Sequence, residues 1–148
     1  MAFNLERVKE QLKIDEGVKT DIYLDHLGYK TVGIGHLILD TDPEYDMEVG
    51  EVISEERVDE LFEYDLGTVL IDCKKAFPNW NDYSDVVQEV LINMMFNLGM
   101  TRLLKFKKFI AAIDAGDWKE AGIQMEDSRW WSQVGPRAVR LRERILNQ

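Results

Sequence analysis

The chain has 148 residues, of which 45% are hydrophobic and 31% are charged. This length favours one domain, and this composition is ordinary for a soluble globular protein. The formal net charge of −10 at pH 7 argues against nucleic acid as the main partner. Apolar runs fall short of the ~18 residues of a membrane span, and residues 1–14 are amphipathic and charged. We therefore expect neither membrane insertion nor a signal peptide.

The charge is unevenly distributed along the chain. Residues 1–100 contain 8 basic and 22 acidic side chains, whereas residues 101–148 contain 10 basic and 6 acidic ones. The basic final third could meet an anionic polymer, although solvated helix faces would give the same count. With two histidines and one cysteine, the chain is expected to hold no metal. Cys73 falls among the apolar positions of a predicted helix and is interpreted as a small buried hydrophobic side chain.

In chain order, the first predicted element is an amphipathic helix over residues 4–15, where apolar residues recur at helical spacing. Gly17 can take the left-handed conformation that closes a helix, which puts Glu16 at the helix C-terminus. Residues 22–24 and 29–34 are rich in strand formers and flank a short loop that contains glycine. This pattern predicts a β-hairpin.

Residues 36–50 are acidic and irregular, which predicts a loop that could contain a short strand. A long helix is expected over residues 55–75. Ser54 is its predicted N-cap, and Pro78 lies just beyond its end.

The rest of the chain is predicted to be helical. Residues 86–98 form a wide apolar stripe, which is typical of a helix at the centre of a core. A further helix is expected over residues 103–113. Asp117 and Glu120 have the spacing of a capping box, and Pro136 is a good first residue for the last helix.

The first part of the chain brings together three polar side chains of different kinds. Glu16 is predicted at a helix end, Asp25 at the hairpin turn, and Thr31 on the returning strand. Two carboxylates in different settings can divide acid and base work, which glycoside hydrolysis requires. Because the chain has 28 acidic residues, this pairing alone is weak support, and both carboxylates could be ordinary surface groups.

The order of several motifs makes the interpretation specific. In sequence they are D-E-G at residues 15–17, T-V-G-I-G-H-L at 31–37, L-F-E-Y-D at 61–65, L-I-N-M-M-F-N-L-G at 91–99 and S-R-W-W-S-Q-V-G-P-R at 128–137. Together they span nearly the whole chain, and the chain resembles the phage-type lysozymes, glycoside hydrolase family twenty-four. The resemblance implies an α+β lysozyme fold in a single domain over residues 1–148. Its expected parts are a hairpin lobe at about residues 14–54, a connecting helix at 55–75, and a helical lobe from residues 1–13 and 76–148.

The resemblance also implies roles for the polar side chains. Glu16 would be the general acid, and Asp25 would stay ionised to stabilise the developing cation and help activate a water. Thr31 would hold that water. Arg137 is expected near Glu16, where it would anchor the carboxylate and help to bind substrate. His36 and Asp65 match an ion pair of the family and are expected to be structural.

Two further residues are expected to bind substrate, each with an alternative. Asn97 occupies a cleft-lining position in the resemblance, but a satisfied buried amide would explain it equally well. Trp130 offers a flat face for a sugar, but could as readily pack in the core. Leu27 and Lys30 replace more polar or aromatic companions, and the segment from His36 to Leu61 is shorter than in the enzyme that the chain most resembles. Sugar and peptide subsites are therefore not carried over.

The resemblance implies an endolysin, a muramidase that cleaves the β-1,4 bond between N-acetylmuramic acid and N-acetylglucosamine in bacterial peptidoglycan. It implies a monomer without a cofactor, made in the host cytoplasm and released to act on the cell wall. A lytic transglycosylase needs the acid but no carboxylate that activates water, so Asp25 and Thr31 argue against it. A wall-binding module on a decayed lysozyme scaffold should have lost Glu16, Asp25 or Thr31, and all three are present.

Overall fold

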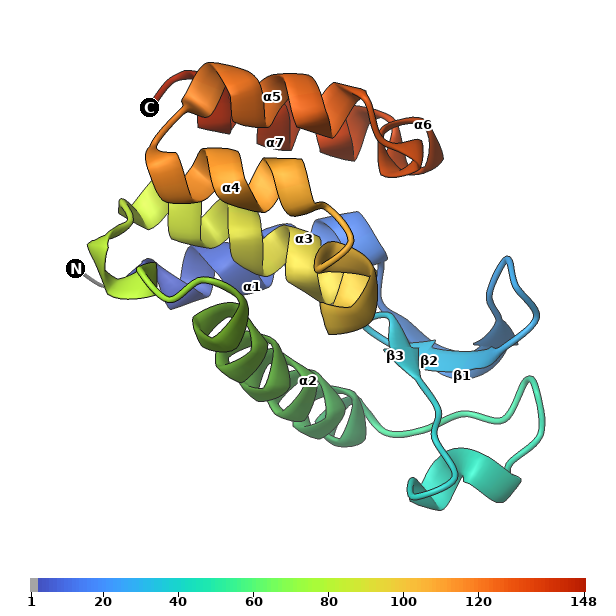
Figure 1. The fold of residues 1–148 in the computed structure, drawn as a ribbon. Helices are drawn as coiled ribbons and strands as arrows, with labels where there is room; N and C mark the ends of the chain where they lie inside the picture. Colours follow the sequence, from blue (N-terminus) through green and yellow to red (C-terminus); the bar gives the residue numbers. More distant parts are fainter. Residues whose placement is uncertain (1–2) are drawn as a thin grey trace. The chain divides into compact units, whose positions relative to one another are not determined.

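The computed structural model describes residues 3–148, which divide into two compact units. The hairpin unit is Lys9–Thr68. The helical unit combines the described residues up to Val8 with Val69–Gln148. Helices dominate the described chain, and its three strands form one small antiparallel sheet near the N-terminus (Figure 1). The predicted α+β class is confirmed.

The sheet of the hairpin unit follows the first helix. Helix α1 (Leu5–Glu16) ends where Gly17 takes a φ of 77°, and the Gly17 N–H donates to the carbonyl of Lys13 at 2.9 Å. Strands β1 (Lys19–Leu24) and β2 (Lys30–Gly33) form the predicted hairpin. A short strand β3 (His36–Leu37) then pairs with β2, giving the order β1-β2-β3.

The acidic segment after the sheet is more ordered than a loop prediction suggests. It contains a 3-10 helix, η1 (Pro43–Asp46), and residues 50–53 run beside β1 through backbone bonds that include an isolated bridge between Asp21 and Val52. Lys30 Nζ donates to the carbonyls of Tyr45 and Met47, both at 2.8 Å. The segment is therefore held against the sheet.

The long helix α2 (Glu55–Ala76) begins as predicted. The Ser54 hydroxyl accepts a hydrogen bond from the Arg57 N–H at 3.0 Å, which confirms Ser54 as the N-cap. Arg57 in turn donates two bonds to the buried Glu44 carboxylate at 2.8 and 2.9 Å. The start of α2 and the acidic segment are thereby joined within the hairpin unit.

The helical unit is built around one buried helix. A 3-10 turn, η2 (Trp80–Asp82), leads into α3 (Asp85–Leu103), whose middle residues are almost all buried. Because α3 is apolar on most sides, other helices can cover it. Helix α7 (Pro136–Leu146) packs against α3, and α6 (Arg129–Val134) packs against α7. Helix α5 (Trp118–Glu126) packs against α4 (Lys107–Ala115) and α7 (Figure 1).

Two local predictions in this unit need correction. The helix expected over residues 103–113 is wrong at its start, because α3 continues to Leu103 across a kink at Gly99 (φ 78°) and α4 begins at Lys107. The capping box is half formed, since Asp117 accepts a bond from the Glu120 N–H at 3.1 Å. The Glu120 carboxylate instead accepts a bond from Gln124 at 2.9 Å.

Within residues 3–148, every helix is too short or too polar to cross a bilayer.

Candidate active site

Glu16 stands at the end of α1, where its carboxylate is closely packed. One of its neighbours is Gly35, in the G-I-G-H motif at residues 33–36. A Cβ atom added to Gly35 would lie 2.7 Å from Glu16 Oε1, so a larger residue would collide with the carboxylate. Gly35 also has a φ of 64°, which favours glycine. The motif thus places a residue without a side chain against Glu16.

Asp25 is held by the turn that it opens. Its Oδ1 accepts hydrogen bonds from the N–H groups of Leu27 at 2.8 Å and Tyr29 at 2.9 Å. The bond from Tyr29 is the main reason that the pKa of Asp25 lies below its usual range, and the bond from Leu27 adds to it. Both of these bonds are made to Oδ1, and a backbone hydrogen bond from Gly28 also lowers the pKa of Asp25.

Thr31 lies on β2 and is 5% exposed. Its hydroxyl donates to the carbonyl of Tyr29 at 3.0 Å. A hydroxyl has one hydrogen, so Thr31 Oγ1 can still accept a bond but cannot donate a second one. Glu16, Asp25 and Thr31 all belong to the hairpin unit.

His36 and Asp65 are brought together, and a third residue joins them. His36 Nδ1 lies 2.7 Å from Asp65 Oδ2, and His36 Nε2 lies 2.8 Å from Asp42 Oδ2. Burial alone would lower the pKa of His36, but the bonds to Asp65 and Asp42 outweigh it and raise that pKa. Sequence reasoning missed Asp42, whose place in a long acidic run gave no signal of its own.

The structure corrects the expectation that Trp130 offers a face to a sugar. Trp130 is 2% exposed, and its indole N–H donates to Asn97 Oδ1 at 2.7 Å. The core-packing alternative therefore describes Trp130. Asn97 is half-buried, and its carbonyl oxygen serves this bond while its amide group remains a possible donor to substrate.

Arg137 is buried at the start of α7 in the helical unit. Its Nε donates to Asn93 Oδ1 at 2.8 Å, and an Nη donates to the Asn93 carbonyl at 3.3 Å. A bidentate contact of this kind fixes the plane of the guanidinium group. The approach of Arg137 to Glu16, a residue of the hairpin unit, stays a prediction.

Comparison with known proteins decides the family. Residues 13–145 match the family model described as phage lysozyme. The chain belongs to the phage lysozyme family. Membership indicates a glycoside hydrolase, and the matched region includes every residue for which the sequence predicted a role.

The relatives of this phage lysozyme chain come from two settings. It is 35% identical to the pre-baseplate central spike protein Gp5 of Enterobacteria phage T4, over 93% of this chain but 27% of that protein. It is 29% and 30% identical to the probable T4-type lysozymes 1 and 2 of Dictyostelium discoideum, over 90% of each chain. The chain thus spans about a quarter of the spike protein and most of each lysozyme.

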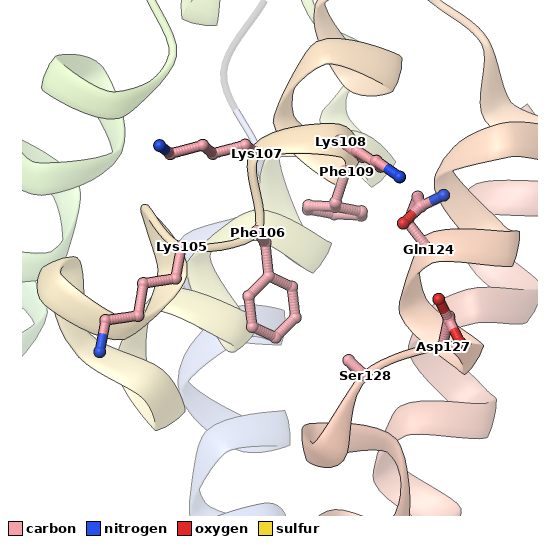
Figure 2. Close-up of a pocket in the computed structure, with 8 residues that line it drawn as sticks. All are labelled: Lys105, Phe106, Lys107, Lys108, Phe109, Gln124, Asp127 and Ser128. Carbon is pink, nitrogen blue, oxygen red and sulfur yellow. The ribbon is translucent and has the colours of Figure 1, made fainter.

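The helical unit also contains a pocket of about 380 Å³, apart from the residues assigned so far (Figure 2). Phe106 and Phe109 contribute its apolar surface. The side chains of Lys105 and Lys107 point away from the other lining residues, so the lysines form no single anion site (Figure 2). Its lining residues are Lys105, Phe106, Lys107, Lys108, Phe109, Gln124, Asp127 and Ser128.

Cys73 behaves as the sequence predicts for a core residue. It is fully buried in α2, and burial raises the pKa of its thiol far above the usual range. Such a thiol is unreactive. Among the described residues, no group of three or more histidine, cysteine, aspartate or glutamate side chains is placed to hold a metal.

Proposed function

We propose that this chain is a muramidase that hydrolyses the β-1,4 bond between N-acetylmuramic acid and N-acetylglucosamine in bacterial peptidoglycan. The observation that carries the proposal is the different setting of two carboxylates in the hairpin unit. Asp25 accepts two backbone hydrogen bonds that favour its ionised form. Glu16 instead ends α1, where its carboxylate lies against Gly35. Membership of the phage lysozyme family supports the same division of labour.

In the proposed mechanism, Glu16 is the general acid. It gives its proton to the glycosidic oxygen as the bond between that oxygen and the anomeric carbon breaks. Positive charge then grows at the anomeric carbon, and the ionised Asp25 stabilises it. Arg137 is proposed to hold the Glu16 carboxylate in place, and the amide group of Asn97 to contact a sugar.

The attacking water is proposed to lie between Thr31 and Asp25. Because the Thr31 hydroxyl already donates to the Tyr29 carbonyl, it can only accept a bond from this water. The water would then donate one hydrogen to Thr31 Oγ1 and the other to Asp25 Oδ2, which leaves its lone pairs for the anomeric carbon. As the new C–O bond forms, Asp25 takes up the hydrogen that the water donates to it. The O–H that remains becomes the hydroxyl group on the anomeric carbon.

A water in this position predicts an inverted product. An inverting pair of carboxyl groups is separated by about 6.5–9.5 Å, whereas a nucleophilic carboxylate needs about 5–5.5 Å. The test is NMR of the anomer formed in the first minutes of cleavage, before mutarotation. We expect the α anomer from the β-linked glycan, and a β product would exclude Asp25 as a base acting through water. Thr31→Val should fold normally and lose most activity.

The same digest separates hydrolysis from the rival reactions. A hydrolase leaves a new reducing end on N-acetylmuramic acid, whereas a lytic transglycosylase leaves a 1,6-anhydro sugar. A wall-binding module would release neither. Mass spectrometry of digested, purified peptidoglycan would therefore identify the reaction class, and an anhydro product or an intact glycan would contradict the proposal.

We propose host lysis as the setting, because the family model that matches residues 13–145 is described as phage lysozyme. The similarity to a central spike protein favours a second setting, in which the same chemistry opens the wall during entry of a virion. Mass spectrometry of purified virions tests this choice. A lysis enzyme should be absent from particles and present in infected cells late in infection.

A further inference from the structure

Tyr23 lies on the face of the sheet that carries the proposed catalytic groups. In the register of β1 and β2, Tyr23 is directly opposite Thr31. Directly opposed residues of an antiparallel pair point to the same face, with Cβ atoms about 4.5–5.5 Å apart. Asp25 follows Tyr23 by two residues, so it shares this face at the end of the strand. Tyr23 therefore stands next to the residue proposed to hold the water.

The ring of Tyr23 is held in place from one side. Lys19 Nζ lies 4.7 Å from the ring centroid, in a cation–π contact from the first residue of the same strand. The ring is half-buried. This contact places a cation against one face of the ring.

The surroundings of the phenol keep it protonated. Burial raises the pKa of Tyr23, and the negative charges of Glu16 and Asp25 raise it further. A neutral phenol near an acid and a base can donate a hydrogen bond. It does not take up the proton that leaves Glu16 or the proton that moves to Asp25.

We propose that Tyr23 is a substrate-positioning residue, whose hydroxyl donates a hydrogen bond to the sugar that is bound between Glu16 and Asp25. This inference rests on the proposed function. A sugar presents hydroxyl and acetamido oxygens that can accept such a bond. A fixed donor beside the water site would orient the anomeric carbon toward the water without taking part in proton transfer.

The first test is Tyr23→Phe, which keeps the ring and its contact with Lys19. On a soluble peptidoglycan oligosaccharide, we expect kcat/KM to fall by about threefold to tenfold, the effect of losing one neutral hydrogen bond. Because the bond orients the reacting sugar, kcat should fall more than KM rises. Tyr64→Phe is the matched control, since Tyr64 lies on α2 and is 73% exposed. Wild-type kcat and KM in Tyr23→Phe would overturn the proposal.

The second test measures the geometry without using activity. In protein labelled with ¹³C at tyrosine Cζ, the chemical shift of Tyr23 follows the ionisation of its phenol. We expect the pKa of Tyr23 to fall in Glu16→Gln and in Asp25→Asn, because each change removes a nearby negative charge. The signal of the exposed Tyr64 serves as the reference in the same spectra. An unchanged pKa of Tyr23 in both variants would show that its hydroxyl is not beside these carboxylates.

Failure of this inference and failure of the proposed function give different results. If Glu16→Gln abolishes cleavage and Tyr23→Phe behaves as wild type, the function stands and the role of Tyr23 is lost. If a folded Glu16→Gln protein still cleaves peptidoglycan, the proposed mechanism itself is wrong.

Discussion

Gly35 restricts what can stand beside the Glu16 carboxylate. Its φ of 64° is a backbone conformation that is strained for residues with a side chain. A Cβ atom at this position would also lie 2.7 Å from Glu16 Oε1. The first effect concerns stability and the second concerns the position of the proposed acid. Gly50 can serve to separate the two effects. It also has a positive φ, of 95°, but the space around its Cβ position is open.

We predict that Gly35→Ala and Gly50→Ala each destabilise the protein by about 1–2 kcal/mol, because alanine is strained in the left-handed region. Gly35→Ala should in addition lower kcat about 10²-fold, since displacement of a catalytic group by about 1 Å can have that effect. Denaturant unfolding and turnover on peptidoglycan measure the two effects. Equal activity in the two variants would show that the contact with Glu16 does not matter for catalysis.

The role of Glu16 itself has a direct test. Glu16→Gln keeps the shape of the side chain but removes the proton that we propose it gives to the leaving oxygen. We predict normal folding and a loss of turnover of at least 10²–10⁴-fold, the range for a general acid. Circular dichroism and clearing of purified peptidoglycan are the measurements. Near-wild-type clearing would remove Glu16 from the mechanism.

At the scale of elements, His36 links β3 to the acidic segment and to α2. Both ring nitrogens face carboxylate oxygens, from Asp42 and Asp65, and an ionised carboxylate can only accept. This arrangement favours the imidazolium form of His36, in which both nitrogens donate, and it accords with the raised pKa of His36. The Asp42 carboxylate also accepts a bond from the Leu39 N–H at 2.8 Å. The Asp42 side chain thus ties the residue before η1 to both His36 and Leu39.

This cluster predicts a pH window for the hairpin unit. The folded pKa of His36 is raised, so its contribution to stability is complete below the unfolded value of about 6.5 and is lost as pH rises through the folded pKa. Burial would raise the pKa of Asp42, but bonds from Leu39 and His36 lower it overall. Its contribution is present above the unfolded value of about 3.9 and lost as pH falls through the folded pKa. Stability from the cluster should therefore be greatest between the unfolded values of about 3.9 and about 6.5 and should fall outside this window.

Asp42→Asn tests this prediction. We expect the pKa of His36 to fall, because one of its two carboxylate partners loses its charge. We expect the unfolding free energy at pH 6 to decrease by about 1–3 kcal/mol. Proton NMR of the histidine rings measures the pKa, and the exposed His26 serves as an internal reference. An unchanged titration of His36 would mean that Asp42 does not pair with it in solution.

The elements that sequence predicts well are those with local signals. Ser54, Asp117 and Pro136 mark helix starts because a cap or first-turn residue acts within a few positions of itself. The order of the acidic segment depends instead on partners such as Lys30 and Arg57, which lie 13 to 17 residues away from their contacts. An acidic run has no periodicity from which such partners could be predicted. The sequence therefore predicts a loop there.

In the candidate site too, local motifs identify some residues, whereas other contacts appear only in the folded chain. The motifs assign roles to Glu16, Asp25 and Thr31, but the pairing of Tyr23 with Thr31 depends on strand register. Trp130 follows Arg129 in a motif that fits either a sugar platform or a core residue. The bond from its indole to Asn97, 33 positions earlier, decides for the core. Burial and long-range partners are properties of the folded chain, which a motif does not record.

At the scale of the whole molecule, the helical unit joins distant parts of the chain at one buried carboxylate. Glu89 on α3 is 3% exposed. It accepts hydrogen bonds from Arg7 Nε on α1 at 2.8 Å and from Arg144 on α7 at 2.9 Å, and a longer one from the Asn4 N–H at 3.4 Å. Segments from near both chain ends therefore meet at the central helix. Burial would raise the pKa of Glu89, but the bonds from Arg7, Arg144 and Asn4 lower it overall.

We predict that Glu89→Gln lowers the stability of the helical unit by about 1–3 kcal/mol at pH 7, since it weakens charged hydrogen bonds to a buried group. Glu143→Gln removes the same charge from an exposed pair with Arg142 on α7 and should change stability by about 0–1 kcal/mol.

Fluorescence is a suitable measurement, because all four tryptophans of the chain lie in the helical unit. Urea unfolding followed at pH 7 and at lower pH then reports on this unit alone. Because the folded pKa of Glu89 is lowered, its contribution is present above the unfolded value of about 4.3 and is lost as pH falls through the folded pKa. The difference between wild type and Glu89→Gln should therefore shrink on acidification. A difference that stays constant with pH would show that packing, and not the charge of Glu89, accounts for its effect.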